Sequence, residues 1–252
     1  MKKTLVILLI CLGLLPAVSH AQTATSTARI ARLPILIYHS VRPYYPGITN
    51  LVKEYTVPPD IFEDQMKYLR DNGFTVVTFD DLSAYFQAGA ALPAKPVMVT
   101  LDDGWENQYI YAFPILKKYK YVGTFYIYPS VIGKKHFLIW PEIKEMIAGN
   151  MVIASHSQSH PELPKITDPV LLKKEISGSK EVIEKELGIR IMDFAYPFGA
   201  YNDQSVQMVK DSGYRSARTV RAGVRADSSA PFTIDGIIIT GDFNRFVSLV
   251  NK

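Results

Sequence analysis

Short apolar runs alternate with amphipathic segments along most of the chain. The run 97–101 is apolar or β-branched at every position and leads into two aspartates, which is typical of a strand buried on both faces of a parallel sheet. Comparable runs predict seven further strands, at 35–38, 75–79, 124–128, 151–155, 191–196, 214–217 and 233–240. The pattern therefore indicates a large sheet.

Amphipathic segments between these runs predict helices. The clearest begins with Asp168 and ends at Gly188; another has Asp60 as its N-cap, and 109–119 should kink or start late because it contains a proline. Strands that alternate with helices form a parallel sheet with right-handed crossovers. About eight such strands predict an α/β fold close to a (β/α) barrel in one domain, with an open doubly wound sheet as the alternative.

The first residues have the pattern of a secretory signal peptide. Lys2 and Lys3 precede an apolar run over 5–15, and small residues around Ala21 fit a cleavage site. The apolar run is shorter than the roughly 20 residues that a membrane-spanning helix needs. We therefore expect a secreted or cell-envelope protein without a membrane span after cleavage, organised as a signal peptide over 1–21, a polar linker over 22–33 and a folded domain over 34–252.

Composition restricts the kinds of site that the domain can hold. The single cysteine, Cys11, lies inside the apolar run, so the domain has neither a disulfide nor a thiolate metal ligand. The formal net charge is +4, and +2 without Lys2 and Lys3, which is too small to argue for nucleic acid. We expect no nucleic-acid partner, and the sequence leaves the oligomeric state open.

Residues with reactive side chains follow several of the predicted strands. His39 follows the first strand, Asp102 and Asp103 follow the third, His156 follows the fifth, and the sixth ends in 196–199 (Tyr-Pro-Phe-Gly). In a (β/α) barrel these positions share the rim at the carboxyl ends of the strands, where such folds carry their chemistry. The pattern predicts one active site on that rim.

His156 and His160 are spaced so that one short helical turn would place both rings on one side. Neutral imidazoles suit zinc and neighbouring transition metals, and a third ligand should be a carboxylate because no thiol is present. Such a pair can also be two hydrogen-bonding loop residues, but the aspartates at the end of a buried strand favour a metal site. A 2-His-1-carboxylate iron centre is a weaker alternative, since it is typically built on an all-β scaffold with a His-x-Asp spacing.

Asp102 and Asp103 are adjacent, so their side chains should point in roughly opposite directions and have different roles. One can bind a metal ion while the other takes a proton from water. An Asp-Asp-Gly sequence can also be a simple turn. Asp80 and Asp81 illustrate this alternative in the same chain, because they precede a predicted helix and have the pattern of a cap.

Two motifs together resemble the polysaccharide deacetylase family, the NodB-type carbohydrate esterases. They are 100–104 (Thr-Leu-Asp-Asp-Gly) and 156–160 (His-Ser-Gln-Ser-His), and the resemblance extends over about 34–240. It implies a distorted (β/α) barrel of seven to eight strands. It also implies a divalent metal ion, most often zinc, with cobalt or nickel as alternatives.

The resemblance further assigns roles to individual residues. Asp102 would be the catalytic base, and the metal ligands would be Asp103, His156 and His160. Tyr196, Pro197 and Phe198 match a third motif, whose backbone and aromatic groups line the substrate groove and help to hold the oxyanion. Trp105 is a further candidate for stacking on a sugar ring.

Two departures from the family pattern affect the mechanism. Members usually carry an arginine two residues before the proline of the third motif, where it orients the base, and this chain has Ala195 there. Many members also have a late histidine as general acid, but no histidine follows His160. We assign the acid to His39, as in the branch whose domain begins with Tyr-His after its first strand. The alternative is a histidine that only hydrogen-bonds a neighbouring loop.

We therefore expect a metal-dependent hydrolase that removes N-acetyl groups from an amino-sugar glycan, such as a chitin-, peptidoglycan- or poly-N-acetylglucosamine-like polymer or oligosaccharide. An amine is a poor leaving group unless it is protonated, which is why the reaction needs an acid. Two alternatives are an O-acetyl esterase acting on xylan or a similar glycan, and a non-catalytic glycan-binding module. The complete set of aspartates and histidines argues against the second.

Overall fold

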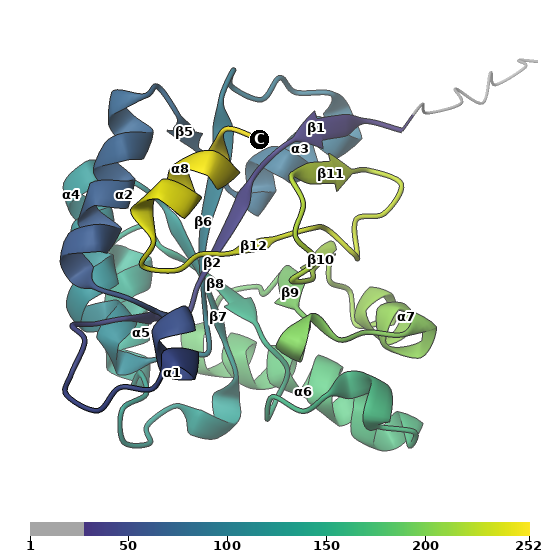
Figure 1. Cartoon of the computed structure of the whole chain (residues 1–252). Coiled ribbons are helices and arrows are strands. Elements are labelled where there is room, and N and C mark those ends of the chain that lie inside the picture. Colours follow the sequence, from purple (N-terminus) through teal and green to yellow (C-terminus); the bar gives the residue numbers. More distant parts are fainter. Residues whose placement is uncertain (1–27) are drawn as a thin grey trace, which may run out of the picture.

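The computed structural model describes residues 28–252, which fold around one parallel sheet (Figure 1). The strand order is β10-β9-β8-β7-β6-β2-β12, and β5 also pairs with β6. Every pairing in this sheet is parallel. The strands are β2 (Ile35–Tyr38), β5 (Thr75–Val76), β6 (Pro96–Asp102), β7 (Gly123–Ile127), β8 (Val152–Ser155), β9 (Asp193–Ala195), β10 (Ser216–Arg218) and β12 (Ile237–Ile238).

The sheet curls into an open barrel whose two edges are linked by one short segment. Ile234 forms a bridge with Arg218 of β10, and β12, which follows closely, pairs with β2. The predicted strand 233–240 is therefore divided between the two edges of the sheet. This architecture confirms the predicted α/β fold, a distorted barrel in a single domain.

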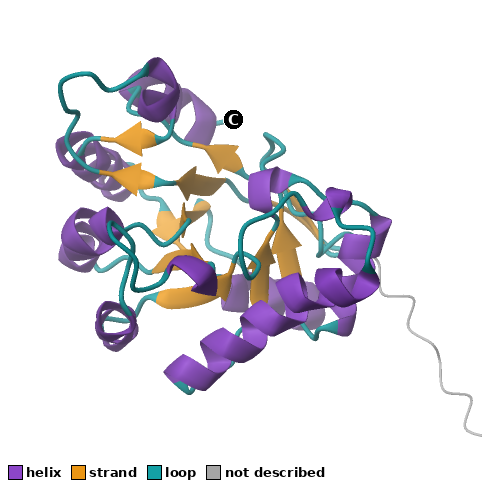
Figure 2. Cartoon of the chain, turned by 90° about the horizontal axis from the view of Figure 1, so that it is seen from below, coloured by secondary structure: helices purple, strands orange, loops and turns teal. Residues whose placement is uncertain are grey.

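Helices surround the strands (Figure 2). They are α2 (Pro59–Asp71), α3 (Phe79–Ala88), the π-helical turn η1 (Gln108–Ala112), α4 (Phe113–Tyr119), α5 (Trp140–Ala148), α6 (Pro169–Leu187), α7 (Asp203–Asp211) and α8 (Phe243–Val250). Pro114 lies in the first turn of α4, after the π-helical turn, so the predicted late start is confirmed. Asp168 caps α6 as expected, whereas Asp60 lies in the first turn of α2 and Pro58 occupies the cap position.

Strand residues alternate between two hydrophobic clusters, as the period of two in a strand requires. Along β6, Val99 and Leu101 belong to the outer cluster that packs against the helices, and Met98 belongs to the inner cluster. Asp102 has the same parity as Met98, so it faces the concave side of the sheet. The inner cluster also contains Ile35, Tyr126, Ala154, Ala195 and Ile234.

The amino-terminal part of the described chain joins the fold earlier than its polar composition indicates. β1 (Ile30–Arg32) pairs antiparallel with β11 (Arg225–Asp227), so the folded domain includes residues that we assigned to the linker 22–33. The signal peptide expected over 1–21 lies outside the described residues. Within residues 28–252, no helix has the length and apolar character needed to cross a membrane.

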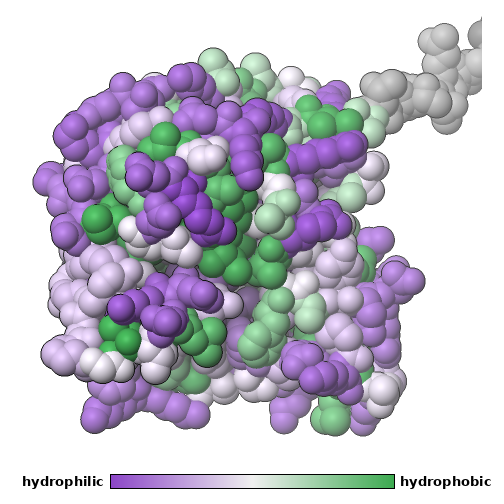
Figure 3. All heavy atoms as spheres, in the orientation of Figure 1, coloured by the Kyte–Doolittle hydropathy of each residue, from purple (hydrophilic) through white to green (hydrophobic). Residues whose placement is uncertain are grey.

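The proline- and tyrosine-rich segment 42–55 has no helical pattern, yet it contains the short helix α1 (Asn50–Glu54). It then leads into β4 (Thr56–Val57), which pairs with β3 (Ser40–Val41). The segment thus forms a wall beside the carboxyl ends of β2 and β6. The face of the molecule drawn in Figure 3 carries hydrophobic residues along its middle, between hydrophilic margins.

Candidate active site

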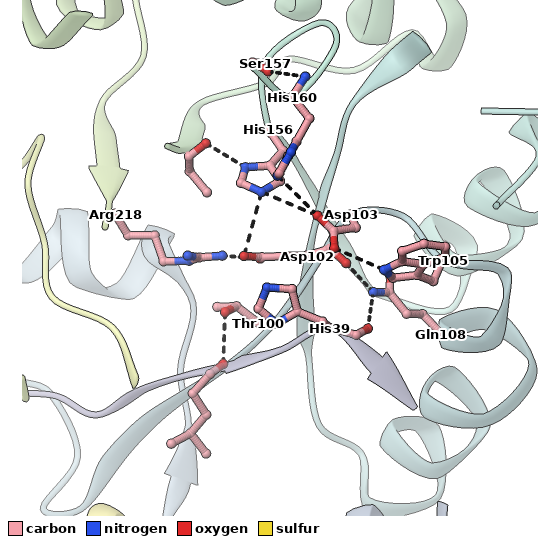
Figure 4. A network of polar contacts seen from close by, with 12 residues as sticks. His39, Thr100, Asp102, Asp103, Trp105, Gln108, His156, Ser157, His160 and Arg218 are labelled. Carbon is pink, nitrogen blue, oxygen red and sulfur yellow. Dashed lines mark hydrogen bonds and ion pairs between the residues drawn. The ribbon is translucent and has the colours of Figure 1, made fainter. Parts of the chain in front are cut away.

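The two aspartates at the end of β6 have different neighbours (Figure 4). Asp102 is 1% exposed; its Oδ1 accepts a hydrogen bond from Arg218 Nη2, while its Oδ2 lies 3.9 Å from His156 Nε2. Asp103 has a φ of 76°, a left-handed conformation that aspartate tolerates better than most residues. That turn directs the second carboxylate away from Arg218 and towards the histidines.

Asp103, His156 and His160 converge on one point. Asp103 Oδ1 lies 3.7 Å from His156 Nε2 and 3.5 Å from His160 Nε2, and the three ligand atoms all lie within 4.8 Å of one another. Ligand atoms bound tetrahedrally at ~2.1 Å from a zinc ion are ~3.4 Å apart. Two imidazoles and one carboxylate at this spacing therefore fit a catalytic transition-metal site with positions left for water and substrate.

Second contacts orient these candidate ligands. His156 Nδ1 hydrogen-bonds the Ala195 carbonyl oxygen at 2.7 Å, which leaves Nε2 free, and Asp103 Oδ2 accepts from Trp105 Nε1 at 3.1 Å. Burial lowers the pKa of His156 to about 4, so its ring is neutral at pH 7. A neutral imidazole with its other nitrogen hydrogen-bonded is the form that binds metal ions.

The segment 156–160 is a bend and not a helical turn. Ser157 and His160 have φ values of 66° and 62°, and the His160 N–H donates to Ser157 Oγ at 2.9 Å. Glu175 of α6 accepts hydrogen bonds from two further backbone N–H groups of the bend. The predicted helical turn is therefore wrong, although the bend does bring the two rings together, with centroids 4.7 Å apart.

Arg218 occupies the space beside Ala195, where the family pattern would place an arginine. The two residues are direct partners on the neighbouring strands β10 and β9. The Arg218 side chain is fully buried, and its guanidinium lies 4.6 Å from the centre of the Tyr126 ring. Sequence reasoning missed Arg218; the available signal was its position directly after the predicted strand 214–217, at the same rim as the other polar residues.

The charge of Arg218 keeps Asp102 ionised despite its burial. Burial raises the pKa of Asp102, but Arg218, with smaller contributions from His156 and His39, lowers it to below the ordinary value of an aspartate. At neutral pH the group is a carboxylate with one oxygen bound to Arg218 and the other facing the histidines. That free oxygen is suitably placed to accept a proton.

His39 directly follows β2 and lies beside Asp102, because β2 and β6 are neighbours with Tyr38 opposite Leu101. Its ring meets the Tyr55 ring nearly edge-on, with centroids 4.9 Å apart. Its Nδ1 is buried and has no hydrogen-bond partner in residues 28–252, and no carboxylate of these residues forms an ion pair with it. The imidazole is therefore held by packing and by its backbone.

A groove of about 800 Å³ contains these side chains and lies within the usual size range of ligand sites. Trp105, stacked on Phe137 at 4.4 Å, forms part of its lining, and the segment containing α1 lines another part of it with Leu51 and Tyr55. The catalytic candidates that line it are His39, Asp102, Asp103, His156 and His160. They include His39, Asp102, Asp103 and His156, which the sequence placed at the ends of three predicted strands.

The third motif is arranged differently from our expectation. The Tyr196 ring is fully buried, and its N–H donates to the Arg218 carbonyl oxygen at 3.2 Å, so this N–H is not free for an oxyanion. Pro197 is buried and does not line the groove. Phe198 is 62% exposed, lines the groove and packs 4.6 Å from the His160 ring. Its N–H makes no hydrogen bond within the described chain.

The fold and the residues on its rim are those of a hydrolase built on a distorted (β/α) barrel. Residues 89–217 match the family model for polysaccharide deacetylases, and the chain belongs to the polysaccharide deacetylase family. It is 30% identical over 214 residues to the putative polysaccharide deacetylase YxkH of Bacillus subtilis, covering 85% of this chain and 74% of that protein.

Two further similar proteins carry the word deacetylase in their descriptions. It is 26% identical to a poly-beta-1,6-N-acetyl-D-glucosamine N-deacetylase of Staphylococcus aureus, over 82% of this chain and 78% of that protein. The structure of the Streptococcus pyogenes deacetylase PplD in complex with acetate superimposes with a TM-score of 0.80 at 27% identity, covering 88% of this chain and 99% of that one. Both similarities extend over most of this chain.

Proposed function

We propose that this protein is a metal-dependent N-deacetylase of an amino-sugar glycan that acts outside the cytoplasm. The observation that carries the proposal is the convergence of Asp103, His156 and His160 beside an Asp102 whose outer oxygen is free. The similarity to a poly-beta-1,6-N-acetyl-D-glucosamine N-deacetylase supports an N-acetylglucosamine polymer as the substrate class. The amino-terminal pattern of a signal peptide supports export.

A divalent transition metal, most simply zinc, would polarise the acetyl carbonyl and lower the pKa of an attacking water. Asp103, His156 and His160 would hold it, with Trp105 fixing the orientation of Asp103 through the hydrogen bond to Oδ2. Asp102 Oδ2 takes the proton of the attacking water while Arg218 keeps that carboxylate in place. The arrangement separates ligand and base between two adjacent residues.

The other half of the reaction needs an acid and a donor for the oxyanion. His39, which lines the groove next to Asp102, protonates the departing nitrogen, because an amine leaves only when protonated. Phe198 N–H is the free backbone donor of the third motif, and Tyr196 N–H is not, since it is used between strands. The exposed Phe198 ring and Trp105 supply apolar surface for sugar rings.

Acetate release from a small panel of glycans tests the proposal. The panel contains β-1,6- and β-1,4-linked N-acetylglucosamine pentamers and an O-acetylated xylooligosaccharide, each with and without a chelator. We expect release from an N-acetylated pentamer, its loss on chelation and its return with zinc, cobalt or nickel. Release from the xylooligosaccharide alone would identify an O-acetyl esterase, and no release from any glycan under any metal condition would contradict an enzymatic function.

A further inference from the structure

The Gln108 side chain joins the two strand ends that carry the proposed acid and base. Gln108 is the first residue of η1 and is fully buried. Its Nε2 donates to the His39 carbonyl oxygen at 2.7 Å and to the Asp102 carbonyl oxygen at 2.5 Å (Figure 4). Both N–H bonds of one amide are therefore directed at the backbones of two residues that lie 63 positions apart in the sequence.

These two carbonyl groups lie where the parallel ladder between β2 and β6 ends. The last paired positions are Tyr38 and Leu101, and the left-handed Asp103 turns the chain away directly afterwards. A buried carbonyl oxygen needs a donor, and both groups lie beyond the last position at which β2 and β6 pair with each other. The Gln108 amide satisfies both groups and thereby fixes the distance between them.

The residue before Gln108 binds the same turn. Asn107 Oδ1 accepts from the Val41 N–H at 2.8 Å, and its Nδ2 donates to Ser40 Oγ at 3.1 Å. Both amides come from the start of a π-helical turn, a wide turn that is frequent at functional sites. The end of β6 and the segment that carries His39 are therefore held by consecutive side chains of η1.

Within residues 28–252, no hydrogen bond holds the buried nitrogen of the His39 ring. Its Nδ1 has no partner, and Tyr55 meets it only by edge-on packing. Gln108 Oε1 is also buried without a partner in the described part of the chain, where the two carbonyl oxygens are the only groups that bind this amide. A buried amide that leaves its own acceptor unsatisfied is costly to keep, which is consistent with a role beyond packing.

We propose that Gln108 is a positioning residue that holds His39 and Asp102 at the separation needed for acid and base to act on one substrate. This inference rests on the proposed function, because it requires both residues to take part in the reaction. Gln108 would contact neither substrate nor metal. Its effect would reach the reaction only through the two backbones that it binds.

Gln108→Met removes both N–H donors while retaining a side chain of similar length. We expect kcat for acetate release from the N-acetylglucosamine pentamer to fall by about 10- to 100-fold, as is typical for residues that orient an active-site group, with KM and zinc affinity within about threefold of wild type. The matched control is Gln65→Met. Gln65 lies on α2, is also fully buried, and binds Tyr38 Oη and the Thr240 carbonyl oxygen. The control should lose stability but keep kcat.

A double-mutant cycle separates positioning from general destabilisation. In the His39→Ala background, where the acid is already absent, Gln108→Met should lower kcat much less than it does in wild type, because residues that act as a unit are not additive. An equal loss in both backgrounds, or an equal kcat loss in Gln65→Met, would overturn the proposal. If His39→Ala itself keeps full activity, the assignment of the acid to His39 is wrong. That outcome is distinct from a failure of the positioning role of Gln108.

A second variant covers the case in which Gln108→Met does not fold. Gln108→Glu keeps the shape of the side chain but offers at most one donor, and only when protonated, so it cannot bind both carbonyl oxygens. We expect the same loss of kcat and the same dependence on His39 from this variant. Wild-type kcat in folded Gln108→Glu would contradict the proposal.

Discussion

The chain contains two Asp-Asp pairs, and their surroundings give them opposite roles. Asp81 closes the capping box of α3 by accepting from the Thr78 N–H and Oγ1, while Asp80 pairs with Arg215 at the surface. Asp102 and Asp103 instead end a fully buried strand, facing Arg218 and two histidines. An Asp-Asp pair by itself thus does not indicate a role, and the element that precedes the pair decides its chemistry.

Asp102→Asn should have the largest effect on catalysis. The amide keeps the size of the side chain but cannot accept the proton, and the loss of a general base typically lowers kcat by about 10²- to 10⁴-fold. Acetate release from the N-acetylglucosamine pentamer measures the loss. Zinc content should stay close to wild type because Asp103 is intact, and an active Asp102→Asn would remove the base from this position.

Arg218→Met tests the buried ion pair that replaces the arginine of the family pattern. Leaving Asp102 buried without its partner should lower the free energy of unfolding by about 3–5 kcal/mol and kcat by about 10- to 100-fold. Chemical denaturation and acetate release measure the two effects. Arg215→Met is the control. Arg215 lies directly before the other end of β10 and pairs with the buried Asp193 of β9. Similar kcat losses in both variants would mean that the effect is structural.

His39→Ala should lower kcat at least tenfold, which corresponds to about 1.4 kcal/mol of transition-state stabilisation. An amine leaves only when it is protonated, whereas a good leaving group such as 4-nitrophenolate needs little help from an acid. The loss should therefore be clear for the N-acetylated pentamer and small for 4-nitrophenyl acetate. Equal losses on both substrates would show that His39 acts on some other step.

Asp81→Asn and Asp80→Asn should have the smallest effects. Asparagine keeps the acceptor of the capping box, so the free energy of unfolding should change by less than about 1 kcal/mol. The rate of acetate release should stay at the wild-type value in both variants, since neither residue lines the groove. A large loss of activity in either variant would remove the contrast between the two aspartate pairs.

Much of the fold and most of the candidate site were predictable because each depends on local pattern. The strand ends placed His39, Asp102 and His156 on one rim, and the sheet brings them together there. Arg218 was not predictable, because its contact with Asp102 joins residues 116 positions apart and depends on the register of β9 and β10. The same holds for Gln108, whose role depends on where two strands stop.

The errors at the site came from assuming regular local geometry. The spacing of His156 and His160 indicated a helical turn, but left-handed residues and hydrogen bonds to Glu175 form a bend that serves the same purpose. The backbone of the third motif was expected to help hold an oxyanion, but the Tyr196 N–H is used between strands. Spacing identified the residues that meet, while the hydrogen bonds that hold them required the structure.

Equilibrium titration of chelator-treated protein with zinc tests the central claim most directly. Wild type and Asp102→Asn should each bind one zinc ion per chain with similar affinity, while Asp103→Asn should bind at least about 10-fold more weakly because it lacks one of three ligands. Of wild type and Asp102→Asn, only wild type should regain acetate release when zinc is added. Zinc binding by Asp103→Asn that equals wild type, or full activity in the metal-free wild type, would contradict the account.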